Sequence, residues 1–114
     1  MKPIIIRSKI LTKILSVFIT VGAITLFPFI IINPEYDNEI TINHESIHIE
    51  QQRELWVILF YILYVFYWIK NKINRMNNFD AYMNIPFEKE AYEKQYDFNY
   101  ISNERKKHDW KNYL

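Results

Sequence analysis

The sequence HESIH at residues 44–48 constrains this chain more than any other feature. On a helix, two histidines four positions apart lie on the same face and can bind one metal ion together. The glutamate beside the first histidine then reaches a water molecule at the metal and can act as a general base. The motif therefore predicts a helix over about residues 39–54 and a Zn²⁺ site with His44 and His48 as ligands and Glu45 as the catalytic base.

Chance is a weak explanation for this motif. The chain has only three histidines and nine glutamates in 114 residues, and two of the histidines lie inside the motif. A random order of the same residues would contain HExxH in roughly one chain in a couple of hundred. The alternative interpretation is a helix whose histidines pack or face solvent and bind no metal. The third histidine, His108, lies in a basic stretch and is expected to be solvated.

Length and composition exclude several other classes of protein. A chain of 114 residues forms one domain with a modest core. The net charge is +1 and no long basic stripe is present, so nucleic acid is not an expected partner. Cysteine is absent, so a metal must be held by histidine and carboxylate side chains. The single glycine argues for a mostly helical body.

The amino-terminal part of the chain combines basic residues with a long apolar run. Residues 14–32 form a run of 19 positions without a charged residue. This length is at the lower limit for a transmembrane helix, and the run would also fit a signal sequence. However, Pro28 and the β-branched and aromatic residues around it favour a strand. We expect residues 1–23 to form a basic and apolar helix or membrane anchor, helical over about 5–21, and residues 24–32 to form an edge strand.

Polar residues on both sides of the motif suggest how its helix begins and how its histidines are supported. Asp37 or Asn38 is placed to cap the helix. Gln51 and Gln52 follow His48 by about one turn, and one of them, such as Gln52, is expected to lie beside the metal ligands or to stabilise an oxyanion.

Residues 55–69 are wholly apolar or aromatic. As a helix they would span about 22 Å, which is less than a bilayer core of about 30 Å. A crossing here would separate His44 from the carboxylates that follow, and residues 70–88 are too polar to cross back. We therefore expect a helical hairpin in which a helix over 55–72 packs in the core, enters one leaflet or pairs with a partner.

A third metal ligand is expected on a further helix over residues 86–97, which starts with Pro86. Glu88 and Glu90 point about 200° apart on a helix, so only one of them can face the histidines. Ala91 shares a face with Glu88, and its small side chain allows close approach to the motif helix. Glu88 is the predicted ligand and Glu90 the reserve, while an interaction with the helix dipole alone is the alternative for either acid.

HExxH followed roughly 40 positions later by Glu88-x-x-Ala91 resembles the gluzincin metallopeptidases, whose second motif commonly reads E-x-x-A-D. The chain length resembles that of the minigluzincins, and the sequence near both motifs is also similar to short membrane-associated proteins of Bacteroidetes. The resemblance implies a zincin-like fold with a strand lining the substrate cleft. It implies His44, His48 and Glu88 as Zn²⁺ ligands and Glu45 as general base and acid.

The resemblance covers about residues 24–95 and departs from the family pattern at Tyr92. The family usually has an aspartate there, which supports a zinc-binding histidine, and a phenol supplies no negative charge for that purpose. Tyr92, Tyr82, Tyr96 and His108 all remain as donors to an oxyanion.

These observations predict a compact, mainly α, zincin-like single domain over residues 1–114, with a motif helix, a helical hairpin and an edge strand. The predicted function is that of a zinc metalloendopeptidase acting on peptides or unfolded proteins. Residues 14–32 and 55–69 suggest attachment to a membrane or the cell envelope, with a cytoplasmic protein as the alternative. A catalytically inactive zinc-binding protein and a membrane-associated interaction protein are the alternative functions. The segment 98–114 is expected to dock on the domain or to cover the cleft as a latency segment.

Overall fold

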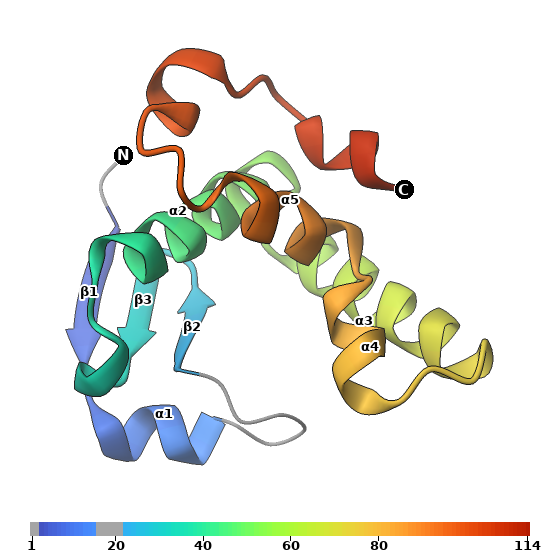
Figure 1. Ribbon diagram of the computed structural model, residues 1–114, viewed down its shortest axis with the longest axis horizontal. Helices are drawn as coiled ribbons and strands as arrows, with labels where there is room; N and C mark the ends of the chain where they lie inside the picture. The colour runs from blue at the N-terminus through green and yellow to red at the C-terminus, as the bar shows by residue number, and fades with distance from the viewer. Residues whose placement is uncertain (1–2, 16–21) are drawn as a thin grey trace.

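A computed structural model describes residues 3–15 and 22–114 of the chain. Figure 1 shows a small sheet on one side of the molecule and the helices α3, α4 and α5 on the other, with the motif helix between them. This helix, α2 (Glu39–Glu54), contacts β2 and β3 of the sheet and also α3 and α5. The predicted mainly helical fold with a small β element is confirmed.

The sheet contains β1 (Ile4–Arg7), β2 (Ala23–Leu26) and β3 (Phe29–Ile32) in the order β1-β3-β2. The central strand β3 is parallel to β1 and antiparallel to β2. The prediction of one edge strand over 24–32 is therefore wrong. The Phe27-Pro28 peptide bond is cis and lies in the turn that divides this range into two strands, of which only β2 lies at an edge.

The predicted helix over 5–21 is also wrong at its beginning. Residues 4–7 form β1 because three consecutive isoleucines, which favour extended backbone, pair with the neighbouring strand β3. The helix α1 (Lys9–Leu15) begins only after Ser8, whose Oγ accepts a hydrogen bond from the backbone N–H of Leu11 at 3.1 Å. The remainder of the prediction, residues 16–21, lies outside the described residues.

The helix α2 has the bounds that the motif predicts. The short 3₁₀ helix η1 (Pro34–Tyr36) leads to Asn38, whose side chain accepts a hydrogen bond from the backbone N–H of Thr41 at 2.8 Å. Asn38 is thus the cap, whereas Asp37 forms an ion pair with Arg7. Capping by Asn38 satisfies a free N–H group at the helix start.

A helical hairpin follows, as predicted. The helix α3 (Ile58–Ile73) begins three residues later than expected because Trp56 and Val57 adopt positive φ angles of 58° and 61° and end the preceding helix. No single helix in the described ranges is long and apolar enough to cross a membrane. The pair α2 and α3 meets this test only when taken together, and its two helices are bent by 112°.

Two further helices complete the domain. The helix α4 (Asn78–Met83), which the sequence analysis did not predict, is capped by Asn77. The helix α5 (Pro86–Lys94) starts at the predicted proline but ends before residue 97. It packs against α2 and carries the two acids considered as metal ligands.

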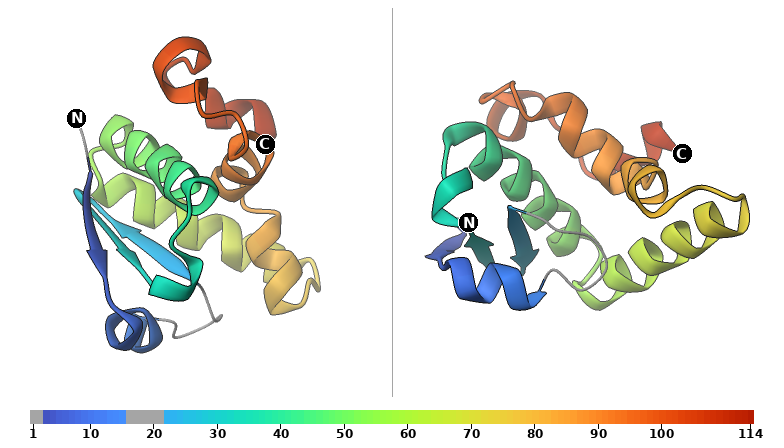
Figure 2. Two further views of the ribbon diagram at one scale, coloured as in Figure 1. Left: turned by 60° about the vertical axis from the view of Figure 1, so that its left-hand side comes forward. Right: turned by 60° about the horizontal axis from the view of Figure 1, so that its bottom comes forward.

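The carboxyl-terminal segment docks on α5, away from the sheet (Figure 2). It contains a π-helical turn, η2 (Tyr100–Glu104), and a 3₁₀ helix, η3 (Asp109–Tyr113). Trp110 packs on Phe87 with 4.6 Å between the ring centroids. Both rings belong to the hydrophobic core, which also contains Leu55, Phe60 and Ile85.

Candidate metal centre

The two motif histidines lie one turn apart on α2 and are both buried. The ring centroids of His44 and His48 are 5.0 Å apart. His44, Glu45 and His48 form a buried group whose potential ligand atoms all lie within 4.8 Å of one another. This group can hold a metal ion, as the motif predicts.

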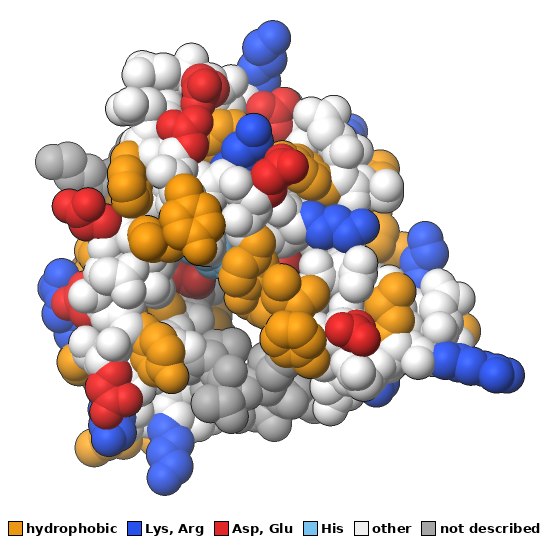
Figure 3. All heavy atoms as spheres, viewed as in Figure 1, with side chains coloured by type: hydrophobic (Ala, Val, Ile, Leu, Met, Phe, Trp, Pro, Cys, Tyr) orange, Lys and Arg blue, Asp and Glu red, His pale blue; other side chains and the backbone are white. Residues whose placement is uncertain are grey.

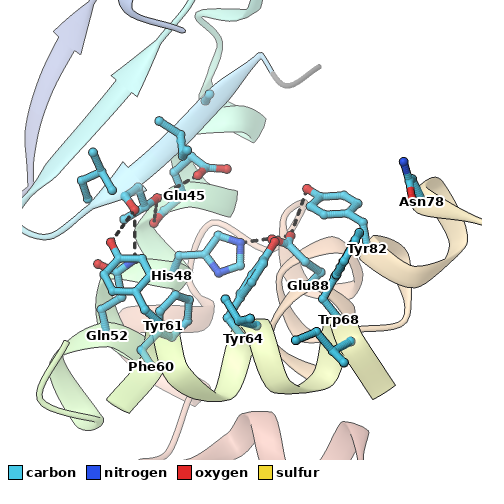
Figure 4. Close-up of a pocket in the computed structure, with 16 residues that line it drawn as sticks. Glu45, His48, Gln52, Phe60, Tyr61, Tyr64, Trp68, Asn78, Tyr82 and Glu88 are labelled. Carbon is cyan, nitrogen blue, oxygen red and sulfur yellow. Dashed lines mark hydrogen bonds and ion pairs between the residues drawn. The ribbon is translucent and has the colours of Figure 1, made fainter. Parts of the chain in front are cut away.

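Glu88 approaches the same two histidines from α5. Its Oε1 atom lies 3.1 Å from Nε2 of His44 and 3.1 Å from Nε2 of His48. In Figure 4 the carboxylate of Glu88 points at the ring of His48, with which it is in contact. One carboxylate oxygen and two imidazole nitrogens therefore converge from two helices.

Glu90 points away from the histidines. Its carboxylate is fully buried and accepts hydrogen bonds from Arg105 Nε at 2.6 Å, Tyr100 Oη at 2.6 Å and Gln51 Nε2 at 2.8 Å. The angular separation of Glu88 and Glu90 on α5 therefore places one acid at the histidines and the other in an ion pair with the carboxyl-terminal segment. Ala91 is fully buried and packs with Ile47 of the motif helix.

Gln51 orients the ring of His48. The Nδ1–H group of His48 donates to Oε1 of Gln51 at 2.7 Å. The amide nitrogen of Gln51 donates to the Phe87 carbonyl at 3.1 Å and to Glu90, which fixes the amide oxygen towards the imidazole. This network assigns the tautomer with hydrogen on Nδ1 and leaves Nε2 for a metal.

Gln95 has the corresponding role for His44. The Nδ1–H group of His44 donates to Oε1 of Gln95 at 2.8 Å, from the residue that caps the end of α5. Tyr92 packs edge-on against His44, with 4.3 Å between the ring centroids, and its hydroxyl hydrogen-bonds that of Tyr82. Gln95 was not among the predicted site residues, although its position seven residues after Glu88 places it on the same helix face.

Replacing Gln95 by leucine should weaken metal binding about 10- to 100-fold, because His44 would lose the acceptor that orients its ring. The affinity for Zn²⁺ can be measured by competition with a chromophoric chelator. Gln95→Glu is the matched variant, since a carboxylate keeps the acceptor for Nδ1–H of His44 and should bind zinc at least as tightly as the wild type. Equal affinities of Gln95→Leu and the wild type would contradict this role.

Glu45 lies between the histidines and the edge strand β2. Its Oε1 atom accepts a hydrogen bond from the hydroxyl of Thr25 at 2.7 Å, and its Oε2 atom lies 3.7 Å from Nε2 of His44. Thr25 is buried on β2, so the sheet fixes one oxygen of Glu45. The sequence analysis did not single out Thr25, because its pairing with Glu45 depends on the packing of strand on helix.

Charges in the site favour a cation. Burial lowers the pKa of His48, but the adjacent Glu88 carboxylate offsets this effect and raises the pKa to about 9. Burial would raise the pKa of Glu88, whereas His48 and His44 hold it well below its usual range. An ionised carboxylate is thus held at the imidazole nitrogens, where a proton and a metal ion compete for the same atoms.

A cavity of about 480 Å³ adjoins these groups, between β2 and α3. Glu45, His48 and Glu88 lie in its wall, and the rest of the lining is mostly apolar and aromatic. Figure 3 shows acidic and histidine side chains in a recess between hydrophobic side chains. No described residue of 98–114 lines this cavity, so the prediction that this segment covers the cleft is wrong.

Two tyrosines of the cavity wall contact the carboxylate of Glu88, the predicted third ligand. Tyr64 donates to Oε2 of Glu88 at 2.7 Å, and Tyr82 donates to Oε1 at 3.2 Å. Burial raises the pKa of both phenols, so they are hydrogen-bond donors at neutral pH. Of the four predicted oxyanion donors, Tyr82 lines the cavity, whereas Tyr92, Tyr96 and His108 do not.

Gln52 supports the sheet, and in the described part of the chain its side chain hydrogen-bonds the backbone around β2 and not the histidines. It accepts from the backbone N–H of Phe27 at 2.9 Å and donates to the Thr25 carbonyl at 3.1 Å. The hydroxyl of Tyr61 donates to the same carbonyl at 3.1 Å. Of these two neighbouring glutamines, Gln51 and not Gln52 hydrogen-bonds a motif histidine in the described part of the chain.

No protein-family model, curated protein or solved structure matches this chain. The geometry of His44, Glu45 and His48 shows a buried group that could hold a metal ion, and the gluzincin resemblance rests on the two sequence motifs alone.

Proposed function

We propose that this protein is a zinc-dependent metallopeptidase of the gluzincin type. The observation that carries the proposal is the position of Glu88 Oε1, 3.1 Å from Nε2 of both motif histidines, beside a cavity that Glu45 also lines. Two imidazoles and one carboxylate, with a glutamate adjacent to them, form the donor set of a catalytic zinc site that keeps one position open.

The chemistry of the donors fits Zn²⁺. Both histidines offer Nε2, since Gln51 and Gln95 engage their Nδ1 atoms. A set of two nitrogens and one oxygen suits zinc, whereas calcium and magnesium prefer oxygen ligands. His44, His48 and Glu88 would therefore hold the ion.

Bound zinc supplies a Lewis acid that polarises a carbonyl and lowers the pKa of water. Glu45 accepts the proton of the attacking water and transfers it to the leaving amine. The hydroxyl of Thr25 engages one carboxylate oxygen, which orients Glu45 and leaves its other oxygen for this proton. Tyr82, a neutral phenol in the cavity wall, donates to Glu88 here and would turn this donor to the developing oxyanion.

The cavity suggests a substrate with apolar side chains. Its walls include aromatic residues of α3, such as Phe60 and Trp68. An extended peptide would add at the outer edge of β2, where main-chain hydrogen bonds give affinity with little sequence preference. The Thr25 carbonyl already accepts two hydrogen bonds, so such a peptide would pair with other groups of the strand.

Zinc removal tests the proposal. The purified chain should bind one Zn²⁺ and hydrolyse an unstructured protein such as casein, lose activity with a chelator and regain it with zinc. Because zinc binds the folded state, a free zinc concentration about 1,000-fold above Kd should raise the free energy of unfolding by about 4 kcal/mol. The same concentration should raise Tm by roughly 10 °C or more. No bound zinc and an unchanged Tm would refute the metal site.

A zinc-binding protein without turnover is the second candidate function. The observation that favours it is the use of neutral amides, Gln51 and Gln95, to support the histidines, because a carboxylate there would increase ligand basicity. Stoichiometric zinc with a raised Tm, and no hydrolysis of unstructured substrates, would support this alternative over the peptidase.

A further inference from the structure

The helix α3 exposes a continuous apolar face to solvent. Seven residues on one side of the helix are between 43 % and 75 % exposed, and all are aliphatic or aromatic. We call this surface the α3 outer face; it consists of Ile58, Leu59, Ile62, Val65, Phe66, Ile69 and Ile73. The opposite side of α3 packs into the core through Phe60, so this helix is apolar on both sides.

Such a face implies a partner. Water-exposed helices normally present polar residues to solvent, and soluble monomers rarely expose a large contiguous apolar patch. The aliphatic side chains of the α3 outer face follow the 3.6-residue period from the first turn of the helix to the last. Scattered exposure of single residues does not produce this pattern.

The charges around this face identify the kind of partner. Residues 55–79 include Lys70, Lys72 and Arg75 but no aspartate or glutamate. The basic residues follow the apolar stretch, at the end of α3. At the other end, Trp56 is 86 % exposed, and tryptophan favours the boundary between water and lipid. An apolar helix face with a cluster of basic residues at one end is typical of helices that lie on anionic membranes.

We propose that the α3 outer face binds the surface of an anionic lipid bilayer. The helix has 16 residues and spans about 24 Å, which is too short to cross the hydrocarbon core but suits a helix lying in the interface. The basic side chains would reach lipid phosphates while their stems cover apolar surface. A second copy of α3 would offer them no acidic partner from this segment.

Membrane binding would bring the cavity to the bilayer. Val65 and Ile69 belong to the α3 outer face and also line the cavity beside Glu45 and His48. The substrates would then be peptide segments at a membrane surface. This consequence rests on the proposed function, whereas lipid binding itself does not.

Co-sedimentation of the full chain with vesicles tests the proposal. The protein should bind phosphatidylcholine vesicles containing about 30 % phosphatidylserine and bind pure phosphatidylcholine weakly, because anionic lipid attracts the basic flank. The combined variant Ile62→Gln, Phe66→Gln and Ile73→Gln should lose at least about tenfold in binding. These three residues do not line the cavity, so zinc content should be unchanged.

The matched control replaces equally exposed apolar residues elsewhere, in the combined variant Tyr96→Gln, Phe98→Gln and Leu114→Gln. It should bind vesicles like the wild type. Glu45→Gln should also bind normally, so failure of the peptidase proposal is distinguishable from failure of this one. Absence of vesicle binding by the wild type, or equal binding by the α3 variant, would overturn the proposal. A dimer that the α3 variant converts to a monomer, with no lipid binding, would assign the face to a second copy.

Discussion

Glu45→Gln is expected to reduce peptide hydrolysis about 10²- to 10⁴-fold and to leave bound zinc unchanged. The amide has nearly the shape of the carboxylate, and its oxygen can still accept the hydrogen bond of Thr25. It cannot take a proton from water at neutral pH, so the step assigned to Glu45 is lost. His44, His48 and Glu88, the proposed ligands, are untouched by this change.

Initial rates on an unstructured substrate and the zinc content of the same preparation measure both parts of this expectation. Glu50→Gln is a suitable control, because Glu50 lies on the same helix but pairs with Arg53 outside the cavity. Its rate should equal that of the wild type. A Glu45→Gln variant that hydrolyses peptides at the wild-type rate would require a different general base.

The parts of the structure that the sequence predicts well depend on local spacing. The bounds of α2 follow from the cap Asn38 and the motif period, and both are properties of neighbouring residues. The opposite directions of Glu88 and Glu90 follow from helix geometry alone. The spacing predicts that only one of these two acids faces the histidines. The contacts of Glu90 with Arg105 and Tyr100 are known only from the structure.

The parts that the sequence did not predict depend on distant partners. Ile4 to Ile6 read equally as an apolar helix start, and β3, which makes them a strand, is more than 20 residues away. Gln95 is recognisable as a support for His44 only when α5 is placed against α2. The same holds for Tyr64, whose contact with Glu88 joins two helices separated by α4.

Glu90→Ala is expected to lower the free energy of unfolding by about 3–5 kcal/mol. Glu90 is fully buried and pairs with Arg105, whose side chain is only 3 % exposed. Removal of the carboxylate leaves a buried guanidinium with Glu54 as its remaining acidic partner, and it frees the hydroxyl of Tyr100. A loss of this size is a large share of the stability of a small domain, so the variant should unfold at much lower urea concentration.

Urea unfolding of the zinc-free protein isolates this structural effect from metal binding. Glu93→Ala, which removes an exposed acid of the same helix together with its hydrogen bond from Tyr113, should lower the free energy of unfolding by no more than about 1 kcal/mol. The zinc content of the purified variants then distinguishes the roles of the two buried acids. Glu88→Ala should lose the metal, whereas folded Glu90→Ala should retain it. Loss of zinc in Glu90→Ala with wild-type stability would reverse these roles. Among the contacts of the described residues, Glu90 reaches the histidines through Gln51 and not directly, which is why zinc is expected to remain bound.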